Sequence, residues 1–303
     1  MLQERLKALR AEMEKRGITV YVVPTADFHE SEYVGDHFKA RKFITGFTGS
    51  AGTAVITLDE AGLWTDGRYF VQAENQLKDS TVTLYRMGEE GVPTVDEFVK
   101  DRLKEGGCLG FDGRVVNGTW GGKLEKIAAE KNVSMHVTED LIDLIWEDRP
   151  ALSKQPLFIL EEKYSGKSTA DKIADLRKAM KENGADVHIL TSLYDIAWLL
   201  NIRGNDIDYV PVVLSYLVLN ETECIWFLQE EVVDDKIRAY LEENHITTKP
   251  YDAIYDYVPE IPADAVVLMN RGTVNYRIVN SLDKAIKVVD KPNPTELMKA
   301  VKN

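Results

Sequence analysis

The sequence has few of the residues on which small metal-bound or redox-active domains are built. Its 303 residues include two cysteines, Cys108 and Cys224, and no CxxC pair. A zinc knuckle and a dithiol redox motif are therefore excluded, and both cysteines are expected to be buried, apolar residues of a reduced, cytoplasmic protein. Long apolar runs are also missing. The longest, PVVLSYLVL at 211–219, has the length of a strand and falls short of the ~18 residues of a membrane-spanning helix.

Positive charge is scarce as well. The chain has 37 Lys and Arg against 50 Asp and Glu, a formal net charge of −13 and a pI near 5.0. An acidic surface repels the phosphates of nucleic acids and of anionic membranes, so neither is expected as a partner. The first stretch, MLQERLKALRAEMEKRG, has the spacing of a charged amphipathic helix and lacks the apolar core of a signal peptide.

The chain does contain an internal repeat. Residues 6–23 align with residues 173–190 at one constant offset and without a gap. The identical pairs are Leu9 and Leu176, Arg10 and Arg177, Met13 and Met180, Gly17 and Gly184, and Val20 and Val187. Each copy has Leu and Met at helical spacing, a Gly suited to a helix C-cap, and then a short β-branched run. The repeat predicts two homologous domains.

The domain boundary is expected near DRPALSKQP at 148–156, where two prolines flank a polar stretch. The predicted domains are residues 1–153 and 154–290, with 291–303 as the start of a further, missing domain. Helices are predicted near 2–16, 68–78, 94–104, 119–131, 139–145, 168–183, 193–200, 232–243 and 276–285. Strands are predicted near 18–23, 51–58, 61–65, 82–85, 108–112, 186–191, 211–219, 223–228 and 265–269. This alternation predicts two layered α/β domains, each with a mixed sheet.

Two stretches contain residue types that often build sites. GFTGSAG at 46–52 matches neither the dinucleotide pattern GxGxxG nor the nucleophile pattern GxSxG, so it predicts a tight loop entering a strand. DFHESEYVGDH contains Asp27, His29, Glu32 and His37, which are metal-ligand types. Their spacing fits no standard helical pair of ligands, and turn or capping roles explain them as well. The turn or capping interpretation is favoured.

Two further loops carry charge. In WTDGRYF, at 64–70, Arg68 can form two bonds with a carboxylate, either a local acid or one bound in a cleft. In NIRGNDIDYVP, at 201–211, Asp206 and Asp208 suit either a cation or simple solvation. No Ser-His-Asp order, acid–base pair or convincing metal set emerges. We therefore predict no catalytic and no metal-binding residue in this chain.

The end of the sequence has helix-start signals without stop signals. Asn293 suits an N-cap, Pro294 the first helical position, and Glu296 the third position of a capping box. Leu297 and Val301, with Ala300, would share an apolar face. A frayed terminal helix explains this pattern, but a chain divided at a domain junction explains it better.

Several stretches that run in order through the chain carry a family resemblance: DFHESEY, ARKFITGFTGSAGTAVIT, WTDGRYFVQA, DLIDLIWEDRP, KIADLRKAM, LYDIAWLLNIRGNDIDYVPV and KAVKN. With them the sequence resembles the N-terminal half of three-domain Xaa-Pro aminopeptidases (aminopeptidase P). The resemblance implies two tandem creatinase/prolidase N-terminal-like domains. Each would be a mixed β-sheet flanked by helices and related to the ribonuclease H motif.

In that family a third, pita-bread domain supplies the metal ligands and catalytic histidines. The resemblance therefore implies a cytoplasmic metalloprotease that removes the N-terminal residue from peptides with proline at position two. It also implies two divalent ions, expected to be manganese, in the full-length enzyme. This chain alone is expected to be inactive and to hold no cofactor. Its expected partners are the enzyme's own catalytic domain, Xaa-Pro peptides and, in full length, a second copy.

Four residues lie in the most family-like segments: Phe43, Phe47, Trp64 and Arg68. We hypothesise that they shape substrate access. Two alternatives stay open: a non-catalytic peptide- or protein-binding module, and the N-terminal part of a prolidase- or creatinase-type hydrolase. The duplication favours aminopeptidase P, because the sister enzymes usually carry one copy of the domain.

Overall fold

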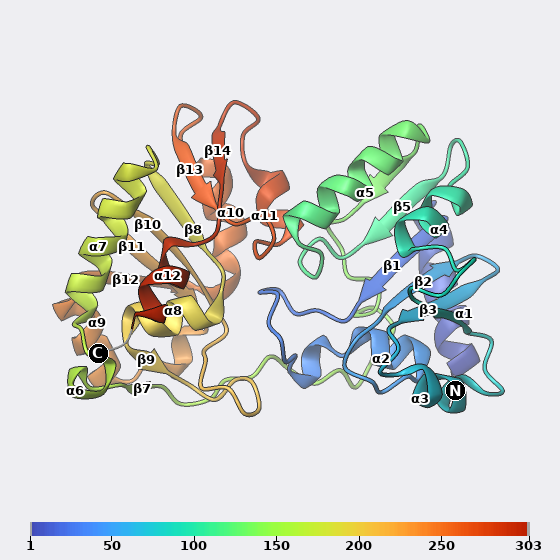
Figure 1. Ribbon diagram of the computed structural model, residues 1–303, viewed down its shortest axis with the longest axis horizontal. Coiled ribbons are helices and arrows are strands. Elements are labelled where there is room, and N and C mark those ends of the chain that lie inside the picture. The colour runs from blue at the N-terminus through green and yellow to red at the C-terminus, as the bar shows by residue number, and fades with distance from the viewer. Residues whose placement is uncertain (1, 302–303) are drawn as a thin grey trace. The chain divides into compact units, whose positions relative to one another are not determined.

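The computed structural model describes residues 2–301, which divide into two α/β units (Figure 1). Residues 2–28 and 36–151 form unit 1, and residues 29–35 and 152–301 form unit 2. Each unit contains one six-stranded mixed sheet with helices on both faces. Within residues 2–301, none of the helices combines the length and the apolar character that crossing a bilayer requires.

The sheet of unit 1 has the spatial order β4-β3-β2-β1-β5-β6. Its strands are β1 (Val20–Pro24), β2 (Thr53–Thr57), β3 (Ala61–Thr65), β4 (Thr83–Arg86), β5 (Cys108–Phe111) and β6 (Ser134–His136). Its helices are α1 (Leu2–Lys15), α2 (Ala40–Thr45), α3 (Phe70–Leu77), α4 (Val95–Arg102) and α5 (Gly118–Glu130). The central strand β1 pairs antiparallel with β2 and parallel with β5.

The sheet of unit 2 has the order β12-β11-β10-β8-β13-β14, and β7 (Phe158–Ile159) pairs separately with β9 (Ile202–Arg203). Its strands are β8 (Val187–Leu190), β10 (Ser215–Asn220), β11 (Cys224–Leu228), β12 (Ile246–Pro250), β13 (Val266–Met269) and β14 (Lys287–Asp290). Its helices are α6 (Glu162–Ser165), α7 (Thr169–Glu182), α8 (Leu193–Leu200), α9 (Asp235–Glu243), α10 (Ile254–Tyr257), α11 (Tyr276–Ser281) and α12 (Pro294–Ala300). β8 pairs antiparallel with β10 and parallel with β13.

The two sheets therefore have the same order and the same strand directions, which confirms the predicted duplication. The repeated glycines end α1 and α7 in the same way. Gly17 and Gly184 have φ of 67° and 63°, a left-handed conformation that glycine adopts without a Cβ clash. The next amides then close the helices, from Ile18 N to Met13 O at 2.9 Å and from Ala185 N to Met180 O at 3.0 Å.

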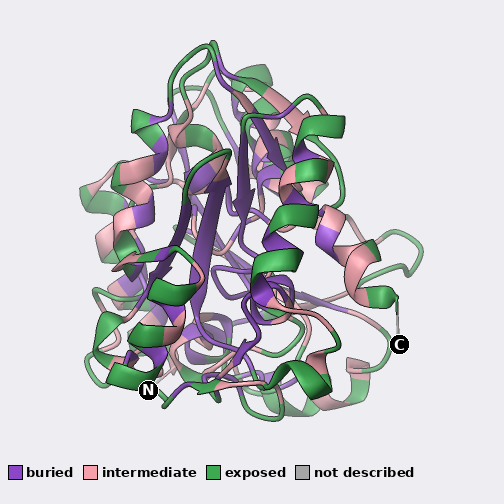
Figure 2. Ribbon diagram, turned by 90° about the vertical axis from the view of Figure 1, so that its left-hand side faces the viewer, coloured by how far each residue is buried: buried purple, intermediate pink, exposed green. Residues whose placement is uncertain are grey.

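Each sheet packs one face against the helices of its own repeat. Buried apolar side chains of α1, α2 and α3 form one core with the sheet of unit 1, and those of α7, α8 and α9 form the equivalent core in unit 2. In α1 the stripe consists of Leu6, Leu9 and Met13, all at most 1% exposed. The strands are buried along most of their length, and the helices present exposed outer faces (Figure 2). The helical spacing of apolar residues thus decides which side of each helix faces the sheet.

The repeated arginines have equivalent contacts. Arg10 Nε donates to Thr57 O at the end of β2 at 2.9 Å, and its Nη2 donates to Glu60 O at 3.0 Å. Arg177 Nε donates to Asn220 O at the end of β10 at 3.0 Å. Each arginine thus binds the hairpin that follows the second strand of its own sheet.

We expect Arg10→Ala to lower the free energy of unfolding of unit 1 by about 1.5–3 kcal/mol, because charged side chains make stronger hydrogen bonds than neutral ones. Arg177→Ala should cost unit 2 less, since it removes one bond instead of two. Urea unfolding of both variants measures this. Lys7→Ala, on the exposed side of α1, is the matched control. An equal loss in the control would show that the hairpin bonds contribute nothing.

The structure corrects several details of the predicted elements. Residues 139–145 were expected to be helical, but residues 141–145 form turns: the i to i+4 bond there runs from Trp146 N to Ile142 O at 3.0 Å, and one such bond does not make a helix. The short helices α2, α6 and α10 and the two-residue strands β7 and β9 were missed. Three edge strands of the main sheets, β6, β12 and β14, were missed as well. They are short and only partly buried, so they lack the apolar run that predicts a strand. The predicted strand at 211–219 begins later, at Ser215.

The predicted terminal helix is present as α12. Glu296 Oε1 accepts from Asn293 N at 3.3 Å, which is one of the two bonds of a capping box, whereas Glu296 N donates to the backbone oxygen of Asn293 at 2.9 Å instead of to its side chain. The buried Asp195 of α8 accepts from Lys299 Nζ at 2.6 Å and from Asn293 Nδ2 at 3.3 Å. The polar side of α12 is therefore held to unit 2, whereas Leu297 is 80% exposed. The last two residues of the KAVKN motif lie outside the described residues.

Candidate functional site

A tight corner after β3 positions Arg68. The guanidinium makes two bonds with the carboxylate of Asp66, both 2.8 Å long, and Arg68 N donates to Asp66 Oδ1 at 3.0 Å. These bonds from Arg68 lower the pKa of Asp66 to about 2, so the pair is fully charged at neutral pH. The arginine side chain remains 71% exposed, with its guanidinium 5.2 Å from the ring centre of Tyr69. The local acid partner predicted for Arg68 is present, and an exposed cation remains at the surface.

The glycine loop at 46–52 lies next to this corner. Ser50 Oγ and Tyr69 OH are 2.6 Å apart, which joins the loop to the residue after Arg68. A Cβ at Gly49 would lie 2.2 Å from the ring of Phe47, so only glycine fits there. The loop leads directly into β2 at Thr53. The prediction of a tight loop entering a strand is confirmed.

Arg41 of α2 holds the loop from inside unit 1. It is 3% exposed, and its guanidinium donates to Phe47 O at 2.5 Å, to Gly49 O, and to Thr25 Oγ1 at 2.9 Å. Burial lowers the pKa of Arg41 to about 10, still well above neutrality. The buried cation thus fixes the backbone of the loop through its carbonyls. Sequence reasoning did not identify Arg41 as a contributor to this loop.

The three aromatic residues predicted with Arg68 are buried in unit 1. Phe47 is fully buried and meets Tyr69 edge to face, with ring centres 6.0 Å apart. Phe43 is 8% exposed and stacks on Trp146 at 4.6 Å. Trp64 packs against α4 and has no exposed surface. The structure therefore brings Phe47 and Arg68 together through Tyr69, and leaves Arg68 as the one of the four with a mostly exposed side chain.

The candidate metal ligands of DFHESEYVGDH do not form a common site. His37, in unit 1, hydrogen-bonds Pro150 O at 2.8 Å, and burial lowers its pKa. His29, in unit 2, donates from Nδ1 to Thr191 O at 3.0 Å and accepts at Nε2 from Tyr251 OH at 2.6 Å. Across residues 2–301, no group of three or more His, Cys, Asp or Glu side chains is placed to hold a metal ion. Both histidines therefore act as hydrogen-bonding residues, each within its own unit.

The two aspartates of NIRGNDIDYVP have different surroundings. Asp206 is 9% exposed, and its two carboxylate oxygens accept from Gln155 N at 3.1 Å and from Leu214 N at 2.9 Å. Burial raises its pKa. Asp208 lies at the exposed tip of the same loop. Asp206 is thus a structural residue, and Asp208 is free to face solvent.

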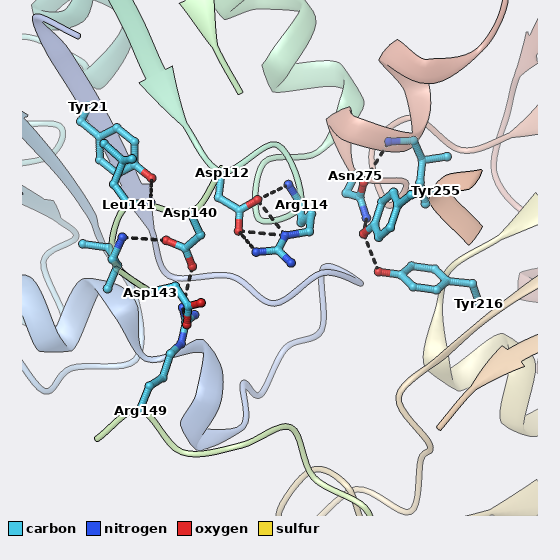
Figure 3. A network of polar contacts seen from close by, with 12 residues as sticks. Tyr21, Asp112, Arg114, Asp140, Leu141, Asp143, Arg149, Tyr216, Tyr255 and Asn275 are labelled. Atoms are coloured by element: carbon cyan, nitrogen blue, oxygen red, sulfur yellow. Dashed lines mark hydrogen bonds and ion pairs between the residues drawn. The ribbon is translucent and has the colours of Figure 1, made fainter. Parts of the chain in front are cut away.

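Unit 1 contains a pair of buried carboxylates, Asp112 and Asp140, each with its own arginine (Figure 3). Arg114 contacts Asp112 at 3.0 Å, and Arg149 Nη1 donates to Asp140 Oδ2 at 2.6 Å. Burial, followed by the charge of Asp112, raises the pKa of Asp140. In unit 2, Tyr216 OH lies 2.9 Å from Tyr255 OH, and Asn275 Nδ2 donates to Tyr255 OH at 3.2 Å (Figure 3). The carboxylates of Asp112 and Asp140 and the ring of Tyr216 are buried.

Family models account for almost the whole chain. Two models, both described as the creatinase/prolidase N-terminal domain, match residues 5–145 and 148–303. The chain belongs to the creatinase/prolidase N-terminal domain family. Its two sheets of identical order are therefore two copies of this domain, which confirms the fold that the resemblance implied.

Curated relatives of this creatinase/prolidase N-terminal chain are longer. The probable Xaa-Pro aminopeptidase P of Neurospora crassa is 39% identical over 94% of this chain and 42% of its own length. Aminopeptidase P2 of Arabidopsis thaliana is 35% identical over 94% of this chain and 41% of its own length. The chain spans about half the length of the curated relatives it matches, or somewhat less.

A solved structure matches all of the chain. It is an X-prolyl aminopeptidase from Caenorhabditis elegans, described as a cytosolic enzyme with a di-nuclear active site. The match has a TM-score of 0.93 and 32% identity, and it covers 100% of this chain and 52% of the other. The resemblance to Xaa-Pro aminopeptidases that the sequence motifs indicated is thereby confirmed.

A second internal repeat was present in the sequence and was missed. FDGRVVN after β5 aligns with MNRGTVN after β13 at one constant offset. Asp112 Oδ1 accepts from Arg114 N, and Asn270 Oδ1 accepts from Gly272 N, both at 2.9 Å. Asn117 and Asn275 then cap α5 and α11. A search for short polar repeats, in addition to apolar ones, would have found them.

Proposed function

We propose that this chain is the N-terminal, non-catalytic region of a metal-dependent Xaa-Pro aminopeptidase. The full-length enzyme would remove the first residue from peptides that have proline at position two. The observation that carries the proposal is the C. elegans X-prolyl aminopeptidase, which matches this chain over its whole length and is about twice as long. The names of the curated relatives support the same activity. Residues 1–153 and 154–290 would be its two N-terminal domains, with 291–303 leading into the catalytic domain.

The described residues do not fit a pair of metal ions, because no suitable group of side chains exists within residues 2–301. The two ions of the proposed enzyme, manganese being our expectation, would be held by another part of the full-length protein. When bound, such ions lower the pKa of a shared water and supply a hydroxide near neutral pH. We infer that the 303-residue chain by itself is inactive and that the full-length enzyme is cytoplasmic, as the C. elegans relative is described.

A direct assay tests this proposal. The 303-residue chain and the full-length protein would be compared on a tripeptide with proline at position two, with manganese added. We expect hydrolysis by the full-length protein and none by the 303-residue chain. A tripeptide with alanine at position two is the control for specificity. Hydrolysis by the short chain would refute its non-catalytic role, and an inactive full-length protein would refute the activity.

We further propose that Arg68 contributes to substrate access in the full-length enzyme. Its guanidinium is 71% exposed and is held in place by Asp66 and Tyr69. Phe43, Phe47 and Trp64, being buried, would act by supporting the segments around it.

Arg68→Ala in the full-length enzyme should raise KM for longer peptides more than for tripeptides, with kcat little changed, because a contact outside the reacting centre supports binding alone. The effect should be a few-fold, as expected for one exposed charge. Lys100→Ala removes another exposed ion pair of unit 1 and is the matched control. Identical kinetics for Arg68→Ala and wild type at every peptide length would exclude this role.

A further inference from the structure

Tyr209 is the most exposed large apolar side chain of residues 2–301, at 98%. It lies at the tip of the loop between β9 and β10. Single exposed aromatics are common on protein surfaces, so exposure alone indicates nothing. The backbone of this residue is unusual as well. Its φ is +67°, in the left-handed region that a bulky side chain adopts at a cost of about 1–2 kcal/mol.

The loop is rigid at its base, so this conformation is held in place. Asp206 fixes both sides of the loop, because its carboxylate accepts from Gln155 N and Leu214 N while its own amide donates to Val212 O at 3.2 Å. Ile207 is 3% exposed and inserts into the body of unit 2. Val210 N donates to Ile207 O at 3.2 Å, which closes a turn around Asp208 and Tyr209. The fold therefore maintains a strained turn whose tip consists of a carboxylate and an aromatic ring.

The chemistry of the tip suits a particular kind of ligand. No hydrogen bond or ion pair engages the carboxylate of Asp208 within the part of the chain that the structure describes. An unpaired carboxylate and an exposed ring on consecutive residues can bind an ammonium group and a compact apolar ring of one ligand. Proline rings pack well on aromatic side chains, and ammonium groups bind both carboxylates and aromatic faces. A peptide with a free N-terminus and proline at position two has these two groups on adjacent residues.

We propose that the Asp208–Tyr209 turn is a substrate-binding element, in which Tyr209 packs on the proline ring and Asp208 pairs with the N-terminal ammonium group. This proposal rests on the proposed function of the full-length enzyme. A permanent protein–protein contact suits the turn less well, because it would bury the unpaired carboxylate of Asp208 at a large desolvation cost. A substrate with a positive charge would pair with the Asp208 carboxylate and so offset its desolvation whenever the substrate is bound.

Kinetics of the full-length enzyme test the proposal. Tyr209→Ala should raise KM for an Xaa-Pro tripeptide roughly fivefold to tenfold, the size expected for one lost aromatic contact, with kcat within about twofold. Tyr209→Phe keeps the ring and should leave KM within about twofold. Asp208→Asn should raise KM for a tripeptide with a free N-terminus. It should leave unchanged the inhibition constant of an N-acetylated tripeptide that is used as a competitive inhibitor. Tyr164→Ala removes another exposed tyrosine of unit 2 and is the matched control.

The outcomes separate this proposal from the one on which it rests. If wild type cleaves no Xaa-Pro peptide, the proposed function fails, and the substrate role of the turn fails with it. If wild type is active and Tyr209→Ala leaves KM unchanged, the substrate role alone is overturned. A lower melting temperature or an altered sedimentation coefficient in Tyr209→Ala, with KM unchanged, would identify the turn as a docking contact and would equally overturn the proposal.

Discussion

Replacing Arg149 by methionine should lower the free energy of unfolding of unit 1 by about 3–5 kcal/mol, the range observed when one partner of a buried ion pair is removed. The side chains of Arg149 and Asp140 are each 6% exposed. Arg149 donates to Asp140 Oδ2 at 2.6 Å, to Asp143 Oδ1 at 3.1 Å and to His37 O at 2.9 Å. Methionine keeps much of the apolar stem but leaves the Asp140 carboxylate buried without its cation.

The free energy of unfolding that Arg149→Met removes should depend on pH in a defined direction. Burial and Asp112 raise the pKa of Asp140 in the folded chain, and Arg149 opposes that rise. Without Arg149 the pKa rises further, so the folded variant binds a proton more tightly than the unfolded chain does. A group with this property adds stability as pH falls through its folded pKa. The difference between wild type and variant should therefore be largest near pH 7 and shrink as the pH falls toward 4.

Urea unfolding at several pH values measures both effects. Lys100→Met breaks an exposed ion pair of the same unit and should cost less than about 1 kcal/mol. Combining Arg149→Met with Asp140→Asn should recover part of the loss, because the buried group is then neutral. A loss for Arg149→Met that equals the control, or one that grows as the pH falls, would contradict the buried ion pair as its cause.

Trp64→Ala should destabilise unit 1 by about 3–5 kcal/mol, as expected for a fully buried large aromatic side chain. Trp64 stacks on Tyr85 with ring centres 4.1 Å apart and an interplanar angle of 2°, and meets the edge of Phe98 at 4.8 Å. Its Nε1 donates to Pro93 O at 2.8 Å. Alanine would leave a cavity between β3 and α4 and an unpaired carbonyl.

The same unfolding experiment tests this expectation. Trp64→Phe should lower the free energy of unfolding less than Trp64→Ala does, because phenylalanine keeps the stack on Tyr85 and loses only the hydrogen bond to Pro93 O. Val71→Ala, at a site that is 73% exposed on α3, is the control and should be neutral. Trp64→Ala unfolding within 1 kcal/mol of wild type would show that Trp64 does not support the core. A kinetic defect of this variant would not by itself demonstrate a contact with substrate, because the loss of packing reaches Arg68 through β3.

The sequence by itself determined the duplicated fold. The helix, its C-cap glycine and the central strand are encoded by neighbouring residues, and the same code occurs twice at one offset, as in Gly17 and Gly184. Apolar spacing identified the buried side of α1, since that choice depends only on the helical period. The long motifs also identified the family. Such features need no knowledge of distant contacts, and each was confirmed.

Tertiary structure alone decided which charges are buried and which residues share a site. Nothing local to Arg41 shows that it holds the backbone of the glycine loop, nor does anything local to Asp140 show that Arg149 neutralises it inside unit 1. His29 and His37 stand close in the sequence, yet each bonds within a different unit. Edge strands such as β14 form because they hydrogen-bond to a neighbouring strand, here β13. Their own side chains do not have the apolar pattern that predicts a strand. Burial and long-range pairing arise only when the chain has folded. For that reason the sequence alone does not show that Trp64 and Asp206 are buried, or that Arg68 and Tyr209 are exposed.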